Sequence, residues 1–315
     1  MRLAPQSSLN DGGLLMKILI SGSHGLVGKA LVTSLTNDGH EVIRLVRRER
    51  QMGAPEVAWD PKRGVIDGEH LEGLEAVVHL AGESIADGRW SDEKKRRIRE
   101  SRVQGTQLLI QALTQLNHPP KTFLCASAIG YYGDRADETL NEASSPGKNF
   151  LSNVCVEWEG ATRPAAEKGI RVVNLRFGII LSADGGALAK MLTPFRMGIG
   201  GRIGSGKQWM SWVALDDVVA AIRRALTDAS LAGPVNIVAP NPVTNAEFTK
   251  RLGQVLARPT LFPVPAFGAR LAFGEMADAL LLSSQRVDPV RLNQAGYQFL
   301  EPELTGALRR SLRGR

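Results

Sequence analysis

The chain of 315 residues has little cysteine, and it has no long hydrophobic run. Its two cysteines, Cys125 and Cys155, cannot build a disulfide framework, so a reducing, cytoplasmic location is the simplest expectation. No apolar stretch approaches the roughly 20 residues that a membrane-spanning helix needs, which argues against a membrane protein. The first residues are polar and contain glycine, so they lack the apolar core of a signal peptide. We expect residues 1–15 to be a disordered leader, or a misassigned start that precedes Met16.

The formal net charge of +7 permits acidic partners without choosing among them. Nucleic acid and phosphate-bearing small molecules are both compatible with it. The one dense basic run, residues 94–102, falls in a predicted helix, where a charge run usually forms a solvated face. A nucleic-acid partner is therefore the least favoured interpretation, and we expect no metal site.

Short apolar runs alternate with helical segments from Met16 onward. Strands of this kind, separated by helices, predict a parallel sheet covered on both faces. A long helix is expected over residues 91–116. We expect Gly39 to close the helix before it, and Asp216 or Asp217 to cap the start of a later helix. The predicted strands are 17–21, 41–46, 76–82, 121–127, 170–176, 208–213 and 234–239.

Beyond about residue 239 the pattern changes to helical segments interrupted by proline. We therefore predict an α/β protein in two parts. A doubly wound parallel sheet is expected over residues 16–239, and a smaller, mostly helical lobe over residues 240–315.

The first predicted strand runs into a glycine-rich turn, with Gly22, Gly25 and Gly28 spaced as G-x-x-G-x-x-G. The triplet alone could be an ordinary turn, but it follows a strand and opens a helix. Glycines let the backbone approach a pyrophosphate, and the helix N-terminus supplies unpaired N–H groups. We therefore expect a dinucleotide at this turn. Its predicted contacts are Gly22, Ser23, His24, Gly25, Leu26, Val27 and Gly28.

The end of the second predicted strand indicates which dinucleotide binds. An NAD site has an acidic residue there to hold the ribose 2′-hydroxyl, whereas this chain has Arg47 and Arg48. A guanidinium pairs with a 2′-phosphate, so NADP(H) is predicted. The competing interpretation is a solvated basic loop.

Four further residues are candidates for cofactor contacts. The third predicted strand ends in Leu80, Ala81 and Gly82, and the small Ala81 and Gly82 would let the adenosine ribose and phosphates pass close. Arg102 falls on the helix stripe that should face the sheet, where a cation needs a partner. That partner is either a cofactor phosphate or a structural carboxylate.

With these motifs, the sequence resembles the extended short-chain dehydrogenase/reductase superfamily, and within it the atypical "epimerase family protein" branch (YfcH-like). The resemblance implies a Rossmann-type domain that binds NADP(H), followed by a small C-terminal domain that closes over a substrate cleft. The stretches that carry the resemblance are ILISGSHGLVG, HLAGESIADGRW, SRVQGTQLL, ASAIGYYGDR, LRFGIILSADGGALAKMLTPF, IGSGKQWMSWVALDDV, NAEFTKRLG and PELTGAL.

Enzymes of that superfamily use a Ser or Thr together with a helical Tyr-x-x-x-Lys for proton transfer and ribose binding. Ser127 matches the first member. If Glu159 is aligned with the acidic residue that usually follows the pair, Leu151 and Cys155 occupy the places of the Tyr and Lys. The resemblance therefore extends to the cofactor turn but not to the catalytic pair. Tyr131 or Tyr132 could reach the cleft from beside Ser127, and Tyr131 is the candidate catalytic residue; the alternative is a simple packing or loop role.

The substrate side is less specific. Gln208 and Trp212 are candidate contacts for a sugar nucleotide or another anionic metabolite, although Trp212 could equally belong to the core. Two functions follow. One is an NADP(H)-dependent oxidoreductase or epimerase-like enzyme acting on a small metabolite. The other is a non-catalytic NADP(H)-binding sensor, which the missing Tyr and Lys favour.

Overall fold

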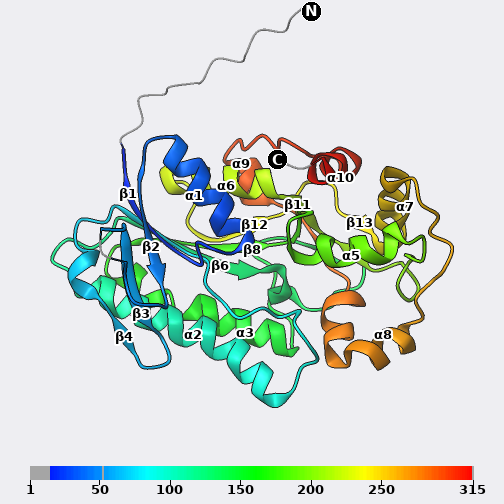
Figure 1. Ribbon diagram of the computed structural model, residues 1–315, viewed down its shortest axis with the longest axis horizontal. Helices are drawn as coiled ribbons and strands as arrows, with labels where there is room; N and C mark the ends of the chain where they lie inside the picture. The colour runs from blue at the N-terminus through cyan, green and yellow to red at the C-terminus, as the bar shows by residue number, and fades with distance from the viewer. Residues whose placement is uncertain (1–14, 52, 314–315) are drawn as a thin grey trace, which may run out of the picture.

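The computed structural model describes residues 15–51 and 53–313 and centres on an eight-stranded sheet (Figure 1). The predicted leader lies outside the described residues, apart from Leu15. Six of the predicted strands are confirmed within a residue or two at most ends, because each is a short apolar run. The strands of the sheet are β1 (Lys17–Ser21), β2 (Glu41–Val46), β3 (Glu56–Asp60), β4 (Val65–Ile66), β5 (Ala76–His79), β6 (Thr122–Ala128), β8 (Arg171–Phe177) and β12 (Gly233–Ile237).

The strand order is β12-β8-β6-β5-β1-β2-β3-β4, and every pair is parallel except β3 with β4. The chain builds outward from β1 through β2 and β3, then crosses to β5 and builds in the opposite direction. The order therefore reverses between β1 and β5. Ligands of doubly wound sheets bind at the carboxyl ends of the strands beside such a reversal, so this edge is the first place to look for a site.

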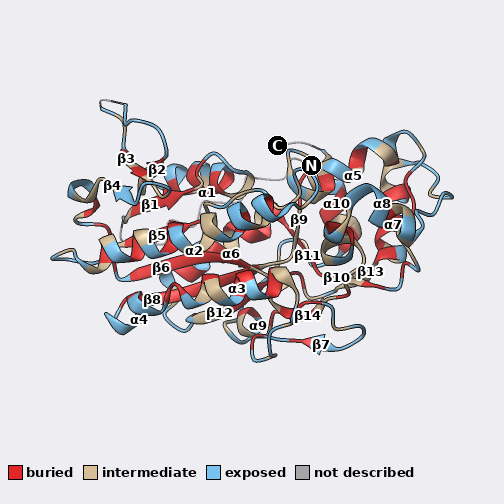
Figure 2. Ribbon diagram, turned by 90° about the horizontal axis from the view of Figure 1, so that it is seen from below, coloured by how far each residue is buried: buried red, intermediate tan, exposed pale blue. Residues whose placement is uncertain are grey.

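Helices cover both faces of the sheet, as predicted. One face carries α1 (Leu26–Asn37) and α6 (Leu215–Thr227), whose apolar sides join one buried cluster with β1, β6, β8 and β12. The other face carries α2 (Asp92–Thr114), α3 (Phe150–Gly160) and α4 (Arg163–Glu167), which share a second cluster. Figure 1 shows the strands between these two helical layers, and Figure 2, which looks onto the sheet, shows that its central strands are largely buried. The α/β, Rossmann-type architecture is thereby confirmed.

The remaining elements gather beyond the carboxyl edge, around a third buried cluster that includes Trp212, Phe248 and Leu308 (Figure 1). Residues from both sides of position 239 contribute to it, and the domain boundary stays a prediction. The helices here are α5 (Gly186–Arg196), α7 (Asn245–Leu256), α8 (Ala266–Phe273), a π-helical turn (Ala277–Leu281) and α10 (Leu304–Leu312), while α9 (Val290–Gln294) packs on β12. Two 3-10 turns lie in the sheet domain, at Gly68–Leu71 and Ile129–Tyr132.

Three short strand pairs supplement the main sheet. They are β9 (Ile179–Leu181) with β11 (Trp212–Ala214), β10 (Trp209–Met210) with β13 (Val243–Thr244), and β7 (Thr139–Leu140) with β14 (Arg286–Val287). The single strand predicted over 208–213 was wrong. The segment breaks at Ser211, whose hydroxyl donates to the Gln285 carbonyl and accepts the Val287 amide, so the two halves pair with different partners.

Two helix ends test the capping predictions. Gly39 has φ +86° directly after the last residues of α1, as a closing glycine requires. The aspartate cap of α6 was wrong, because Ala214 is the N-cap residue and Asp216 and Asp217 lie in the first turn. Asp217 is fully buried and instead accepts the backbone amides of Leu300 and Glu301 at 2.7 and 3.0 Å.

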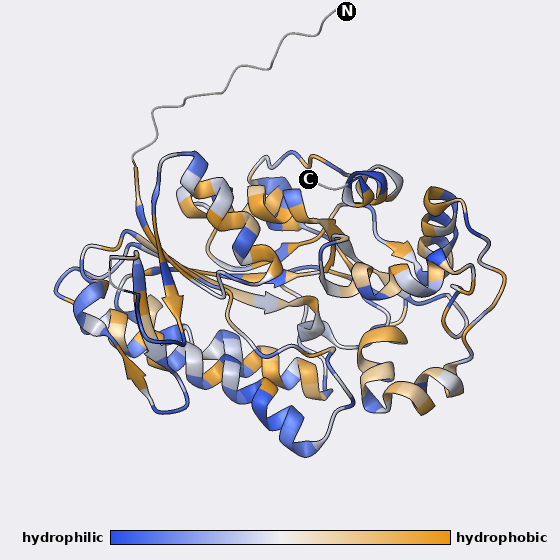
Figure 3. Cartoon of the chain, viewed as in Figure 1, coloured by the Kyte–Doolittle hydropathy of each residue, from blue (hydrophilic) through white to orange (hydrophobic). Residues whose placement is uncertain are grey.

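Hydrophilic residues gather at the N-terminal end of α2, whereas apolar residues follow the central strands and much of α8 (Figure 3). Within residues 15–51 and 53–313, no helix combines the length and the apolar character needed to cross a membrane.

The buried carboxylate of Asp217 should stabilise the return of the chain onto α6. We expect Asp217→Ala to lower the free energy of unfolding by about 2–5 kcal/mol, because two backbone donors and the Tyr297 hydroxyl lose their acceptor. Asp278→Ala is the control: its ion pair with Arg270 is solvent-exposed, so the loss should stay below about 1 kcal/mol. Equal losses in urea unfolding would contradict this assignment.

Candidate functional site

The turn between β1 and α1 is built so that only glycine fits. A Cβ on Gly28 would lie 2.2 Å from the Gly22 carbonyl oxygen, and one on Gly22, at φ +66°, would lie 2.8 Å from the Leu80 carbonyl carbon. Gly25 is the N-cap residue of α1, with no side-chain cap and no acidic residue in the first turn. The first amides of α1 therefore remain available to an anion.

A buried serine–histidine pair holds this turn against the end of β5. Ser21 Oγ accepts hydrogen bonds from the amides of Leu80 and Ala81 at 3.0 and 3.1 Å. Because both of its acceptor positions are used, the hydroxyl donates its hydrogen bond to His79 Nδ1, 2.7 Å away. That arrangement requires neutral His79 with its proton on Nε2. Burial lowers the pKa of His79 to about 4, in agreement with a neutral ring. The two strand ends that flank the reversal are thereby fixed to each other.

Arg102 lies beneath the end of this segment. A Cβ atom added to Gly82 would lie 3.3 Å from the guanidinium carbon of Arg102. The same carbon lies 5.1 Å from the centroid of the Trp158 ring. Nη1 donates to the carbonyls of Glu83 and Ile98, both at 3.0 Å, and burial lowers the pKa of the group. The structural partner is thus a pair of carbonyl oxygens, which corrects the carboxylate alternative considered from the sequence.

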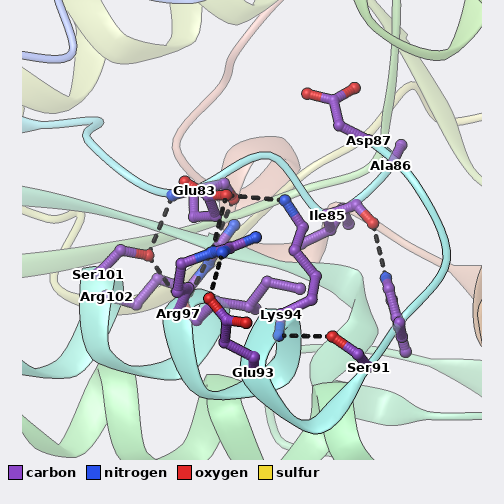
Figure 4. A network of polar contacts seen from close by, with 12 residues as sticks. Glu83, Ile85, Ala86, Asp87, Ser91, Glu93, Lys94, Arg97, Ser101 and Arg102 are labelled. Atoms are coloured by element: carbon purple, nitrogen blue, oxygen red, sulfur yellow. Dashed lines mark hydrogen bonds and ion pairs between the residues drawn. The ribbon is translucent and has the colours of Figure 1, made fainter.

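The loop after β5 is pinned to α2 by the contacts shown in Figure 4. Glu83 accepts a hydrogen bond from the buried ammonium of Lys94 at 2.8 Å, and its amide donates to Ser101 Oγ. The bond from Lys94 lowers the pKa of Glu83, and Arg97 adds a further cation at 3.7 Å. These contacts fix the position of the loop at the edge of the site. Further along the loop, Lys190 of α5 donates a hydrogen bond to the Ala86 carbonyl.

The structure distinguishes the two arginines that follow β2. Arg48 donates to Glu56 on β3 at 2.6 Å, so its guanidinium is already paired. Arg47 is exposed and makes no hydrogen bond or ion pair within the described part of the chain. Of the two, Arg47 is the side chain available to a phosphate.

At the end of β6 a buried polar network surrounds Ser127. Ser127 Oγ donates to Glu159 at 2.7 Å, and Glu159 accepts both Nε and Nη2 of Arg176, at 2.8 and 2.7 Å. Sheet register brings these residues together, because Ser127 on β6 is directly paired with Arg176 on β8. The sequence analysis used Glu159 only for alignment and missed Arg176. The signal was a cation at the end of an apolar strand.

The two adjacent tyrosines differ in their surroundings. Tyr132 is fully buried; its hydroxyl donates to Asn236 at 2.7 Å and accepts from Arg176 at 3.0 Å. The Tyr131 ring is half-buried and stacks on Arg176, whose guanidinium carbon is 3.5 Å from the ring centroid. The Tyr131 hydroxyl makes no hydrogen bond within the described residues.

The places of the missing Tyr and Lys are filled by core residues of α3. Leu151 and Cys155 are both buried. Burial raises the pKa of the Cys155 thiol to about 12, so it is neither a thiolate nucleophile nor a substitute for a lysine cation.

The two candidate substrate contacts are engaged in packing. Gln208 is buried and its Nε2 donates to the carbonyls of Ile203 and Leu281, both at 3.0 Å. Trp212 is fully buried in the third cluster and donates to the Asn241 carbonyl. Neither side chain presents a surface to a substrate in this conformation.

Comparison with known proteins identifies similar chains. The family model described as NAD dependent epimerase/dehydratase family matches residues 18–238, and the one described as Domain of unknown function (DUF1731) matches residues 264–311. The chain is 44% identical over 282 residues to Epimerase family protein MT2273 of Mycobacterium tuberculosis, covering 90% of this chain and 93% of that protein. It is 36% identical over 297 residues to human SDR39U1, covering 93% and 99%.

Two solved structures resemble the whole chain. The human epimerase family protein SDR39U1 (isoform 2), crystallised with NADPH, gives a TM-score of 0.88 at 35% identity and covers 95% of this chain and 100% of its own. A Corynebacterium glutamicum protein, named a nucleoside-diphosphate sugar epimerase, gives 0.79 at 39% identity, covering 96% of this chain and 59% of its own.

The buried histidine at this site should make stability depend on pH. His79 binds a proton near pH 6.5 in the unfolded chain but only near pH 4 in the folded chain. The contribution of the neutral ring to the free energy of unfolding is therefore fully present above pH 6.5 and decreases as the pH falls from 6.5 to 4. The loss attributable to His79 should reach about 3 kcal/mol by pH 4. We expect His79→Gln, which keeps an acceptor for Ser21, to remove this component in urea unfolding. An unchanged pH slope would contradict it.

Proposed function

Because this chain belongs to the NAD dependent epimerase/dehydratase family, we propose that it binds NADP(H) at the β1–α1 turn and uses it on a small metabolite. The observation that carries this proposal is the glycine turn, where missing Cβ atoms and uncapped amides leave room for a pyrophosphate. The NADPH in the human SDR39U1 structure supports the choice of cofactor. The recognised family is confirmed by both the family model and the whole-chain relatives.

Different residues around the turn would bind different parts of the cofactor. The amides of Leu26, Val27 and Gly28 would bind the pyrophosphate, with Ser23 and His24 in the turn before them. The strand end at 80–82 would lie under the adenosine ribose, with Arg102 supporting it from below. When bound, the nicotinamide would supply or accept a hydride at its C4 atom.

Arg47 would select the phosphorylated form of the cofactor. Its guanidinium is exposed at the end of β2 and makes no hydrogen bond or ion pair within the described residues, although its charge helps to lower the pKa of Glu83. Arg48, in contrast, is held by Glu56. A 2′-phosphate would provide the missing bidentate partner.

Tyr131 would exchange the proton in place of the missing helical tyrosine. It lies just after Ser127 at the carboxyl edge, and its hydroxyl makes no hydrogen bond with any residue that the structure describes. The hydroxyl of Tyr132, in contrast, is buried and makes two hydrogen bonds. Arg176 fixes the Tyr131 ring from one face. Ser127 would help to orient the reacting groups, although its proton is currently given to Glu159.

The second candidate is a non-catalytic NADP(H)-binding sensor. The buried Leu151 and the protonated, buried Cys155 favour it, because α3 offers no proton donor and no cation for the nicotinamide ribose. A sugar nucleotide is a candidate substrate by analogy with the C. glutamicum relative's name. Gln208 and Trp212 give that choice no support, and a cytoplasmic location stays a prediction.

Selectivity for the 2′-phosphate is directly measurable. We expect Arg47→Asp to weaken NADPH binding by about 10- to 100-fold while leaving NADH binding nearly unchanged, because a carboxylate would repel the phosphate. Calorimetric titration of both coenzymes gives the two affinities. Arg48→Gln is the matched control and should change the ratio of affinities far less, since that guanidinium is occupied by Glu56. Equal weakening of both coenzymes by Arg47→Asp would show that Arg47 does not read the phosphate.

Turnover distinguishes the enzyme from the sensor. We expect NADPH-loaded protein to oxidise its coenzyme with at least one pool among sugar nucleotides, ketones and quinones, followed by nicotinamide absorbance. Tyr131→Phe should slow that reaction by about 10²- to 10⁴-fold while NADPH affinity is retained. Tyr297→Phe, far along the chain on the α6 side, is the control for loss of a phenol. Tight NADPH binding without turnover of any pool would favour the sensor.

A further inference from the structure

A cavity lies apart from the cofactor turn. Its volume is about 550 Å³, within the range of small-molecule sites, and it is enclosed by the end of β9, the start of α6 and helix α10. Leu181, Ala214 and Leu215, which are buried, contribute apolar surface to its wall. Its lining contains neither the glycine turn nor Tyr131, so it is not part of the site described above.

Three arginines of α10 and its C-terminal end line this cavity, together with the carboxylates of Asp216 and Glu301. Arg310 is neutralised by Asp216 at 2.6 Å and by Glu301 at 3.7 Å. Arg309 and Arg313 are exposed, and neither makes an ion pair within the described residues. They lie one helical turn apart, where like charges repel each other. An anion between them would remove this repulsion and gain two charge-assisted bonds.

The lining of the cavity also includes hydrogen-bonding groups of the segment after β9. Ser182 is buried, and its Oγ accepts the Asp184 amide at 3.2 Å, which leaves the hydroxyl proton for another acceptor. The exposed carboxylate of Asp184 also lines the cavity and makes no ion pair in the part of the chain that the structure describes. A ligand with an anionic end and a hydroxyl or amine would satisfy both the arginines and these groups.

We propose that this cavity is a binding site for a small metabolite whose phosphate or carboxylate group pairs with Arg309 and Arg313. The apolar wall accommodates its carbon skeleton, and Asp184 accepts a hydrogen bond from its hydroxyl or amine. Binding at this cavity does not require the coenzyme to be present.

The cavity also adjoins the cofactor turn through a short segment. Positions 185 and 186, which follow Asp184, contact the side chain of Leu26: a Cβ on Gly186 would lie 3.4 Å from it, and one on Gly185 would lie 3.6 Å away. Leu26 is the first residue of α1. If the proposed function holds, a ligand that orders this segment should change NADPH affinity, and NADPH should change the ligand's affinity by the same factor.

The test is a calorimetric titration of the full-length protein, with and without saturating NADPH, using inorganic phosphate and acetate as separate probes. We expect at least one probe to bind. The probe that binds more tightly shows whether the site prefers a phosphate or a carboxylate group. Arg309→Ala/Arg313→Ala should weaken that probe at least tenfold. Asp184→Asn should tighten it severalfold, because a repelling charge is removed, and misfolding would not produce such a gain.

The control is Lys121→Ala/Lys168→Ala, which removes two exposed cations elsewhere on the chain and should leave probe affinity unchanged. No heat from either probe at millimolar concentration would overturn the proposal, as would equal binding by the double arginine variant. Because the arm without NADPH does not require a bound coenzyme, failure of NADPH binding would leave this test intact.

Discussion

The site depends on one close approach, between the turn after β1 and the end of β5. Gly22 passes so near the Leu80 carbonyl that no side chain fits, and Ser21 ties the same two strand ends together through the Leu80 and Ala81 amides. The buried His79 completes the contact by accepting a hydrogen bond from the Ser21 hydroxyl. These contacts set the direction in which α1 leaves the sheet, and therefore the direction in which its free amides point.

A second constraint is the buried polar network beside α3, the helix that lacks the Tyr and Lys implied by the resemblance to the superfamily. In this chain α3 contributes Glu159, which binds Arg176 of β8 with two hydrogen bonds and also accepts Ser127. The Arg176 guanidinium therefore extends from the sheet and lies against the face of the Tyr131 ring. A tyrosine and a cation are therefore in contact at the carboxyl end of the sheet, and they come from the turn after β6 and from β8.

Local patterns were predictable from the sequence, and long-range partners were not. The apolar runs located most strands, and the glycine spacing located the turn, because both features are decided by neighbouring residues. The break at Ser211 depends on Gln285 and Val287, which are distant in sequence. The difference between Arg47 and Arg48 likewise depends on Glu56 of another strand. The pairing of Arg176 with Glu159 required the register of the sheet, and β3 and β4 were missed because they are short and flanked by polar residues.

The most direct test of the account is a crystal structure of the protein with NADP⁺. The account predicts the pyrophosphate within hydrogen-bonding distance of the amides at Leu26, Val27 and Gly28, and the nicotinamide beside Tyr131. A dinucleotide bound elsewhere on the molecule, with the glycine turn empty, would contradict the central claim.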